Sequence, residues 1–344
     1  MNLPDDAAAA PVAFYHADFC FEARAHAHVL VARQRNVSPT QEHRRAVEAS
    51  RGRSLDTPDH ASRDEQGGDG TAGAWDAFHR QHAGVAFFKE RRYLVSEFPQ
   101  LTVRGKELTV LELGCGNGSS CVPLLTANPD ARVVACDFAP AAVEAARQAV
   151  SRAGAPALRQ RCCVARCVGA HASAAGLSSR FVAFQADPSA AAPAEFAAAL
   201  SAAVALAGWS PLVAFDAVLA VFVLSAVPPA RLPNFLAAVC ARIRPGGALL
   251  VRDYGIYDQA HLRFSPAAAR DGSGRLFSRH DGTLARFFER DELVDVVCSG
   301  AAGGGVHLVG AADWHTVAVR NRAKAITMRR VFVHAVFTRA LDCA

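Results

Sequence analysis

The sequence predicts an α/β protein built on a doubly wound, mostly parallel, seven-stranded sheet. After residue 105, apolar runs of strand length alternate with longer stretches that are compatible with helices. Such alternation is typical of a parallel sheet with helices on both faces. A glycine-rich turn follows the first apolar run, and an aspartate closes the second. Both features belong at the carboxyl edge of the sheet, where open α/β sheets bind their ligands.

The individual elements follow from apolar runs bounded by glycine, proline or charged residues. Strands are expected at residues 108–113, 131–136, 180–185, 213–223 and 247–253, and helices at residues 118–127, 140–152, 194–207 and 231–243. Two final apolar runs, at residues 306–319 and 328–338, suit an antiparallel hairpin that closes the sheet.

The chain before this core has a different composition. Residues 14–35 are expected to form a helix, the Gly-rich polar stretch 50–73 a disordered linker, and residues 75–98 a helix with interleaved aromatic and basic side chains. The domain boundaries therefore fall at 1–74 for a helical extension with its linker, 75–104 for a helical segment, and 105–344 for the core. Residues 255–289 are too long for a turn, so we expect a functional loop inserted in the core.

Composition limits the environment and the partners. The 344 residues are 51% hydrophobic, and no apolar run reaches the length of a membrane span. Neither a signal peptide nor a disulfide framework is indicated, so we expect a cytoplasmic, or also nuclear, protein without membrane contact. The cysteines at 162, 163 and 167 lack zinc-site spacing, and no metal is expected. A net charge of +5 is compatible with a polyanionic partner.

The most informative stretch is the turn after the first strand. Gly114, Gly116 and Gly118 allow the backbone to pass close to a ligand, and Asp137 can accept hydrogen bonds from both hydroxyls of a ribose. A dinucleotide site has Gly-x-Gly-x-x-Gly instead, and Glu112 would repel a pyrophosphate. An anionic Glu112 suits a cofactor that carries an ammonium and a sulfonium. The pattern resembles motif I of the methyltransferases that use S-adenosyl-L-methionine; an ordinary glycine-rich turn is the alternative.

Two classes of nucleic-acid methylation are disfavoured. Enzymes that methylate an exocyclic amine place Asn/Asp-Pro-Pro-Tyr/Phe after the fourth strand, where residues 220–225 read Ala-Val-Phe-Val-Leu-Ser. Methylation of pyrimidine carbon 5 needs a cysteine nucleophile, usually in Pro-Cys or Thr-Cys, and neither dipeptide occurs. The remaining acceptors are a ring nitrogen, a thiol, or an oxygen activated by a base.

Several short blocks, in order over residues 75–338, resemble the eukaryotic tRNA 3-methylcytidine methyltransferases. The blocks are Trp75-Asp76-x-Phe78, Phe87-Phe88-Lys89-Glu90-Arg91-x-Tyr93, Cys136-Asp137-Phe138-x-Pro140, Phe222-Val223-Leu224-Ser225-Ala226-Val227, Arg252-Asp253-Tyr254-Gly255-x-Tyr257-Asp258, Leu262-Arg263-Phe264 and Asp281-Gly282-Thr283. The sequence departs from the family at Tyr93, usually Trp, and at His79, usually Tyr.

The resemblance implies methylation of N3 of an anticodon-loop cytidine at position 32 of a tRNA, with an accessory specificity protein as a further potential partner. Residues 321–331 are most similar to the branch that acts on threonine and arginine tRNAs. Cytosine N3 has an in-plane lone pair and is largely unprotonated at neutral pH, so transfer needs alignment more than a strong base. The base must be unpaired, because N3 lies on its Watson–Crick edge.

The resemblance also places Trp75 and His79, one helical turn apart, over the cofactor as a lid that also contacts RNA. Asp187, after the third strand, is expected to meet the adenine amino group, with Val221 packed on the adenine and Phe138 as a further contact. The alternatives are a plain core role for Trp75 and Val221, a surface-loop role for Asp187, and a helix-cap role for Asp137 at the segment that starts at Pro140, which can coexist with ribose binding.

Arg252, Asp253 and Tyr254 end the fifth strand and are the expected catalytic residues. Asp253 would stabilise charge near the cytosine, Arg252 would orient the base or a phosphate, and Tyr254 or Phe222 would stack on it. An ion pair between Arg252 and Asp253 is the alternative. The expected tRNA contacts are Lys89, Arg91, Arg92, Phe222, Arg263, Arg279, Asp281, Arg286, Arg322 and Lys324. Each basic residue could instead be a solvated surface charge.

Two other functions stay open. The protein could methylate another protein or a small molecule, or it could be an inactive cofactor-binding subunit that presents RNA. Asp137, Asp187 and Asp253 argue against the inactive subunit.

Overall fold

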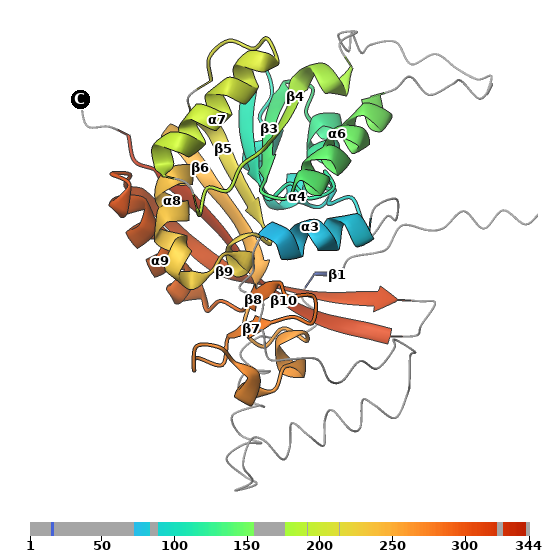
Figure 1. Cartoon of the computed structure of the whole chain (residues 1–344), viewed down its shortest axis with the longest axis vertical. Coiled ribbons are helices and arrows are strands. Elements are labelled where there is room, and N and C mark those ends of the chain that lie inside the picture. The colour runs from blue at the N-terminus through green and yellow to red at the C-terminus, as the bar shows by residue number, and fades with distance from the viewer. Residues whose placement is uncertain are drawn as a thin grey trace, which may run out of the picture.

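The structure, a computed structural model, describes residues 15–16, 72–82, 89–154, 176–190, 192–212, 214–321 and 326–341. Its centre is one large sheet (Figure 1). The strands of this sheet are β1 (Tyr15–His16), β2 (Leu108–Leu113), β3 (Ala131–Asp137), β4 (Phe181–Gln185), β5 (Phe215–Val221), β6 (Ile243–Tyr254), β9 (Leu308–Asn321) and β10 (Ile326–Arg339). Their order is β1-β9-β10-β6-β5-β2-β3-β4.

The seven expected strands are confirmed, and five of them are parallel. β2 pairs in parallel with β3 and β5, β3 with β4, and β5 with β6. β10 is antiparallel to β6 and forms the expected hairpin with β9. Since β2 lies between β3 and β5, the strand order reverses at β2, which creates the switch point where such sheets bind ligands.

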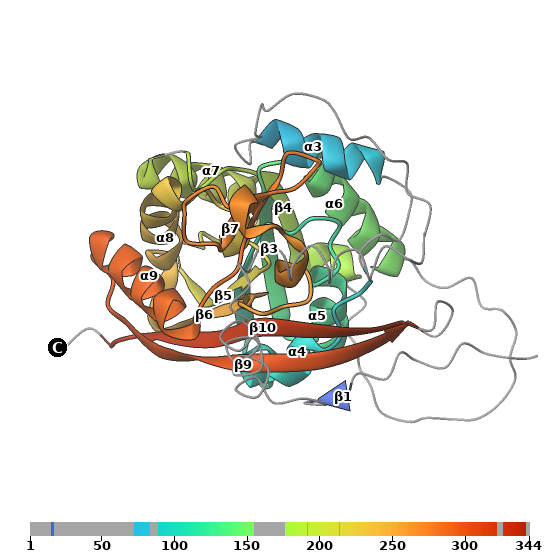
Figure 2. The ribbon, with the colours of Figure 1, turned by 90° about the horizontal axis from the view of Figure 1, so that it is seen from below.

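Helices cover both faces of the sheet, as expected for a doubly wound fold (Figures 1 and 2). They are α3 (Ala72–Gln81), α4 (Leu94–Glu97), α5 (Cys121–Ala127), α6 (Pro140–Gly154), α7 (Pro193–Leu206), α8 (Leu232–Cys240) and α9 (Arg290–Gly303). One apolar cluster packs α7, α8 and α9 on one face through residues such as Phe196, Leu236 and Val297. The cluster on the other face includes Phe98 after α4 and Leu124 of α5.

The continuous helix expected at residues 75–98 is wrong, because α3 ends at Gln81 and α4 begins at Leu94. Before α4, the amide of Arg91 donates to the carbonyl oxygen of Ser119 at 2.8 Å, and its guanidinium donates to the Ser120 hydroxyl. Tertiary hydrogen bonds thus replace helical ones at this point. Residues 83–88, including Phe87 and Phe88, lie outside the described residues.

Two further expectations are corrected. Tyr15–His16 does not start a helix but pairs with Ala318 and Val317 of β9, whose free edge offers backbone hydrogen bonds. The sequence reading also missed α9, whose glycines at 300 and 303 interrupt a helical pattern. The remaining residues of the expected helix 14–35 and of the linker 50–73 are almost all outside the described ranges.

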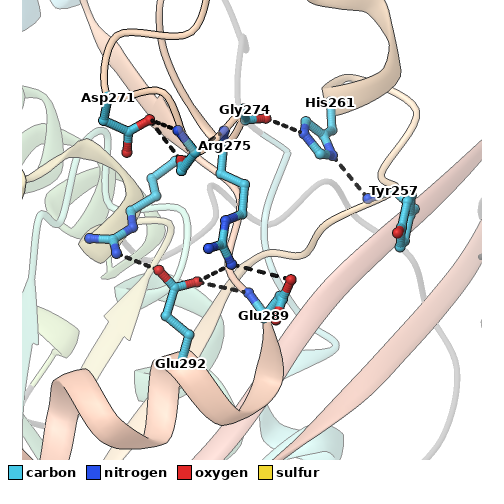
Figure 3. A network of polar contacts seen from close by, with 9 residues as sticks. Tyr257, His261, Asp271, Gly274, Arg275, Glu289 and Glu292 are labelled. Atoms are coloured by element: carbon cyan, nitrogen blue, oxygen red, sulfur yellow. Dashed lines mark hydrogen bonds and ion pairs between the residues drawn. The ribbon is translucent and has the colours of Figure 1, made fainter. Parts of the chain in front are cut away.

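Residues 255–289 form a small packed unit. They contain the hairpin β7 (Leu276–Ser278) and β8 (Leu284–Arg286) and a core of Ile256, Phe277, Ala285 and Phe287. Arg275 ties this unit to α9 through Glu292, with 2.9 Å between Nη1 and Oε2, and His261 bridges the Tyr257 amide and the Gly274 carbonyl (Figure 3). The inserted segment is therefore held firmly against the core.

Within the described part of the chain, no helix is long and apolar enough to cross a membrane.

Candidate active site

A cavity of about 500 Å³ opens at the carboxyl ends of β2, β3 and β5. α3 and the 255–289 unit both lie at this edge of the sheet (Figures 1 and 2). Both contribute to the wall, α3 through Trp75 and His79 and the unit through residues 279–281 and Thr283. We call this the cofactor cavity.

The glycine turn forms the floor of the cofactor cavity. Gly114 and Gly116 have φ of +57° and +52°, a region that side-chain-bearing residues rarely adopt. A Cβ at Gly114 would stand 2.8 Å from a methyl carbon of Val223. The backbone therefore comes close to the cavity because no side chain intervenes.

Asp137 organises this turn from the end of β3. Its Oδ2 accepts the Gly116 amide and its Oδ1 the Ala139 amide, both at 3.0 Å. Burial raises the pKa of Asp137 to about 6, so the carboxylate is anionic at neutral pH. It lines the cavity, where it can accept hydrogen bonds from ribose hydroxyls.

The structure brings most of the other expected cofactor residues into the same wall. Trp75 and His79 lie with ring centres 6.2 Å apart, and Trp75 Nε1 is buried without a hydrogen-bond partner among the described residues. Burial lowers the pKa of His79, which favours a neutral ring. Phe138, Asp187 and Val221 also line the cavity.

Glu112 and Gly118 lie behind the wall. Glu112 is 1% exposed and accepts hydrogen bonds from Cys121 and Ser120, and burial raises its pKa. A Cβ at Gly118 would stand 3.2 Å from the backbone of Ala146, so this glycine allows α6 to approach the turn. Neither residue is among those that line the cavity, so in this structure they shape the turn without direct contact.

One end of the cavity is built from aromatic rings and arginines. The rings of Phe222 and Tyr254 lie 4.8 Å apart, Arg279 lies over Tyr254, and Arg91 lies over Phe222. Asp281 accepts the amide and hydroxyl of Thr283, which fixes the turn between β7 and β8. All of these residues line the cavity. Such a surface can stack and orient a flat heterocycle.

Of the three expected catalytic residues, Tyr254 lines the cavity, whereas Arg252 and Asp253 do not. Successive residues of a strand point to opposite faces, so Arg252 and Asp253 diverge. Arg252 pairs with Glu97, which overturns the alternative of an internal ion pair with Asp253. Asp253 is fully buried and accepts the Ser225 amide at 2.9 Å, and burial raises its pKa to about 6. Ser225 does line the cavity, so Asp253 acts behind it.

The basic residues expected to contact tRNA divide into four groups. Arg91 and Arg279 line the cofactor cavity. Lys89, Arg92 and Arg263 are exposed, although Arg92 pairs with Glu90. Arg286 is ion-paired with Glu292 at 2.6 Å and mostly covered. Arg322 and Lys324 lie outside the described residues.

Sequence reasoning missed several wall residues. Ser225, His280 and Thr283 line the cavity, as does Asn117 in the glycine turn. The block Asp281-Gly282-Thr283 could have indicated Thr283, because an aspartate before a glycine often accepts the backbone amide two residues on and so forms a tight turn. In the described residues, no group of three or more His, Cys, Asp and Glu side chains could hold a metal.

The residues that line the cavity fit a nucleoside cofactor with a cationic methyl donor. The glycine turn, a carboxylate placed to accept ribose hydroxyls and the aromatic residues of α3 are features of an enzyme that transfers a methyl group from S-adenosylmethionine.

Comparison with known proteins agrees with this class. A family model described as "Methyltransferase domain" matches residues 87–297, more than half of the chain, and the protein belongs to that family. Three relatives are similar over most of the chain. They are tRNA N(3)-methylcytidine methyltransferase Mettl2 of Drosophila melanogaster (29% identical over 279 residues, 78% of this chain and 71% of the relative), tRNA N(3)-cytidine methyltransferase METTL6 of Homo sapiens (30% over 226 residues, 64% and 66%) and tRNA N(3)-cytidine methyltransferase METTL2 of Xenopus tropicalis (27% over 303 residues, 77% and 77%).

Proposed function

We propose that this enzyme methylates N3 of a cytidine in tRNA. The observation that carries the proposal is that the three relatives, which align with 64 to 78% of the chain, are all named for this one reaction.

The geometry of the cavity suits this chemistry. Phe222 and Tyr254 offer ring faces for a cytosine that has left its stack, and Arg279 and Arg91 offer guanidinium donors beside them. N3 keeps its lone pair at neutral pH, so these residues need to align it with the methyl group and need not deprotonate it. Asp281 contributes a carboxylate to the wall of the same cavity, and it can stabilise the cationic product.

Asp253 serves this site as a positioning residue. It holds the amide and hydroxyl of Ser225 in the wall of the cavity, and it does not itself reach the cavity in this structure. Arg252 is committed to Glu97, so its part in the reaction is also indirect.

The finer assignments of substrate and place belong to the same proposal. They are position 32 of the anticodon loop, tRNAs for threonine and arginine, an accessory specificity protein, and a cytoplasmic location. The support for the substrate and the accessory protein is the sequence resemblance at residues 321–331 and in the blocks around the site. The support for the location is the set of free, buried cysteines, such as Cys115 and Cys136, which is typical of a reducing compartment.

The test is nucleoside mass spectrometry of tRNA incubated with the purified protein and methyl-labelled S-adenosylmethionine. We expect labelled 3-methylcytidine and no label in other nucleosides. Labelled product in a protein or small-molecule fraction, with none in RNA, would favour the alternative substrate class. Cofactor binding with no transfer to tRNA, with or without added cell extract, would favour the inactive RNA-presenting subunit.

A further inference from the structure

A second cavity, of about 520 Å³, adjoins the cofactor cavity. Of the described residues, Phe222 alone lines both cavities. The second cavity lies among α4, the end of β6 and the β9–β10 hairpin, and Ser96 stands at its exposed rim. Its volume is in the usual range for small-ligand pockets.

The walls of the second cavity favour flat ligands. Tyr93, Phe222 and Phe332 contribute rings. The guanidinium of Arg252 lies 4.4 Å from the ring centres of both Tyr93 and Phe332, and Arg330 lies 5.1 Å from that of Phe332. Rings and guanidinium planes are the surfaces on which the bases of single-stranded RNA stack. Both guanidinium groups are already ion-paired, Arg252 with Glu97 and Arg330 with Asp258, so they contribute flat surfaces and not net positive charge.

The same wall holds unused hydrogen-bonding capacity. Glu97 binds Arg252 and His315 through Oε1. Within the described residues, Glu97 Oε2 and Arg252 Nε have no hydrogen-bond partner, although both are buried. Buried polar atoms are nearly always paired, so an acceptor and a donor are left for a group that enters from outside. A nucleobase edge carries donors and acceptors side by side. Both atoms are covered here, so the entering group must displace a neighbouring side chain.

Phe222 separates the two cavities in a conformation that residues with side chains rarely adopt. Its φ is +59°, and its amide donates to the carbonyl oxygen of Arg252 at 2.8 Å. The ring lies 4.8 Å from Tyr254 on the side of the cofactor cavity and 5.5 Å from Phe332 in the second cavity. Such backbone strain is concentrated at functional sites.

We propose that the second cavity binds the nucleobase next to the target cytidine, with Phe222 inserted between the two bases as a wedge. Apolar side chains inserted at a base step unstack it in other nucleic-acid complexes. The inference rests on the proposed function, since it requires a target base in the cofactor cavity. It adds a site that reads or holds a flanking nucleotide.

The first test detects the flanking base directly. An anticodon-loop RNA carries 4-thiouridine on either side of the target cytidine and is irradiated with the full-length protein. We expect one of the two positions to cross-link to a peptide that contains Tyr93 or Phe332, which peptide mass spectrometry identifies. Cross-links confined to other surfaces, for both positions, would overturn the inference.

The second test blocks the cavity without touching the cofactor. Ser96→Trp places a bulky ring at the rim, and Ser201→Trp makes the same change at an exposed position of α7 as a control. We expect Ser96→Trp to lower kcat/KM for tRNA about 10-fold or more, the loss that removal of one stacked base gives, with unchanged S-adenosylmethionine affinity. An abasic nucleotide at the cross-linking position should cause a similar loss in the wild type and little further loss in Ser96→Trp.

These measurements separate the inference from the proposed function. If the wild type methylates RNA but neither the abasic nucleotide nor Ser96→Trp changes kcat/KM by more than about twofold, the second site is excluded and the function stands. If RNA cross-links in the second cavity without any methylation of cytidine, the base-binding cavity stands and the proposed function fails.

Discussion

Asp137 both stabilises the glycine turn and faces the cofactor cavity. Its two oxygens hold the Gly116 and Ala139 amides, and the same carboxylate faces the cofactor cavity. Because burial raises its pKa to about 6, the folded protein binds this proton more tightly than the unfolded chain does. The buried negative charge therefore lowers the free energy of unfolding at neutral pH, and this loss is relieved as the pH falls through about 6 and Asp137 takes up a proton. Cofactor binding has the opposite pH dependence, because the ribose hydroxyls donate to the ionised carboxylate of Asp137.

We therefore predict that S-adenosylmethionine affinity falls as the pH is lowered through about 6. Calorimetric titrations from pH 8 to pH 5 measure this, with Asp137→Asn expected to bind weakly and with little pH dependence. His79→Phe is the control, because His79 also lines the cavity and titrates below its ordinary value. A wild-type affinity that stays constant to pH 5 would contradict the role given to Asp137.

Asp253 is fully buried and reaches the cofactor cavity only through Ser225. It binds the Ser225 amide and hydroxyl, and Ser225 lines the cavity. We predict that Asp253→Ala slows single-turnover methyl transfer about 10-fold or more while S-adenosylmethionine affinity changes little, since a displaced wall affects alignment. Asp253→Asn, which keeps an acceptor, should recover most of the rate. Equal losses of rate, cofactor affinity and melting temperature would indicate a purely structural role.

At the scale of elements, α3 is a separate helix that docks on the core. Asp76 accepts the Ala141 amide at 3.0 Å, at the N-terminus of α6, where the helix dipole favours a carboxylate. Asp76 is buried but does not line the cavity, whereas Trp75 and His79 do. The orientation of α3 at the cavity thus depends on a contact outside the cavity.

We predict that Asp76→Ala weakens S-adenosylmethionine binding about 10-fold and increases hydrogen exchange in residues 72–82, because one charge-assisted hydrogen bond holds the lid. Arg80→Ala is the matched control. Arg80 pairs with Asp76 but is 71% exposed, so its loss should matter little. An unchanged affinity in Asp76→Ala would show that α3 is not a lid.

A second inter-element contact fastens α4 to β6 and β9. Glu97 binds Arg252 and His315, and both partners in the ion pair are less than 10% exposed. We predict that Glu97→Ala lowers the free energy of unfolding by about 3–5 kcal/mol, because it leaves Arg252 buried and unpaired. Glu90→Ala breaks the exposed pair with Arg92 and should cost under about 1 kcal/mol. Chemical denaturation of both variants measures the difference, and equal losses would contradict it.

Which of these contacts could be predicted depended on how local they are. The glycine turn and Asp137 could be predicted from a few neighbouring residues, because glycines and an aspartate directly after buried strands are typical of a nucleotide-binding edge. The strands could be predicted from their apolar runs. The partners of Arg252 did not, because Glu97 lies 155 residues away and only the packing of α4 on the sheet brings it there. The break between α3 and α4 was missed for the same reason. Within this break, Arg91 donates its amide to Ser119, a tertiary contact that the helix propensities of the local residues do not predict.

At the scale of the whole molecule, the two ends of the parallel strands have different roles. We call them the carboxyl edge and the opposite edge of the sheet. The carboxyl edge holds both the cofactor cavity and the exposed residues Lys89 and Arg92, because the amide of the neighbouring Arg91 is fastened to Ser119 beside the glycine turn. The opposite edge carries Lys106, just before β2, and Arg152, at the end of α6, and both are also exposed. A net charge of +5 says nothing about which edge binds RNA.

We predict that tRNA binding weakens with salt and that the carboxyl edge accounts for the dependence. Each phosphate contact contributes a slope of about −0.7 to −0.9 in log affinity against log salt concentration, so Lys89→Ala with Arg92→Ala should flatten the slope by about 1.4 to 1.8. Lys106→Ala with Arg152→Ala removes the same charge from the opposite edge and should leave the slope within about 0.5 of the wild type. Filter-binding titrations at several salt concentrations measure both. If the two pairs change the slope equally, net charge draws tRNA to the protein and the carboxyl edge has no special part in holding it.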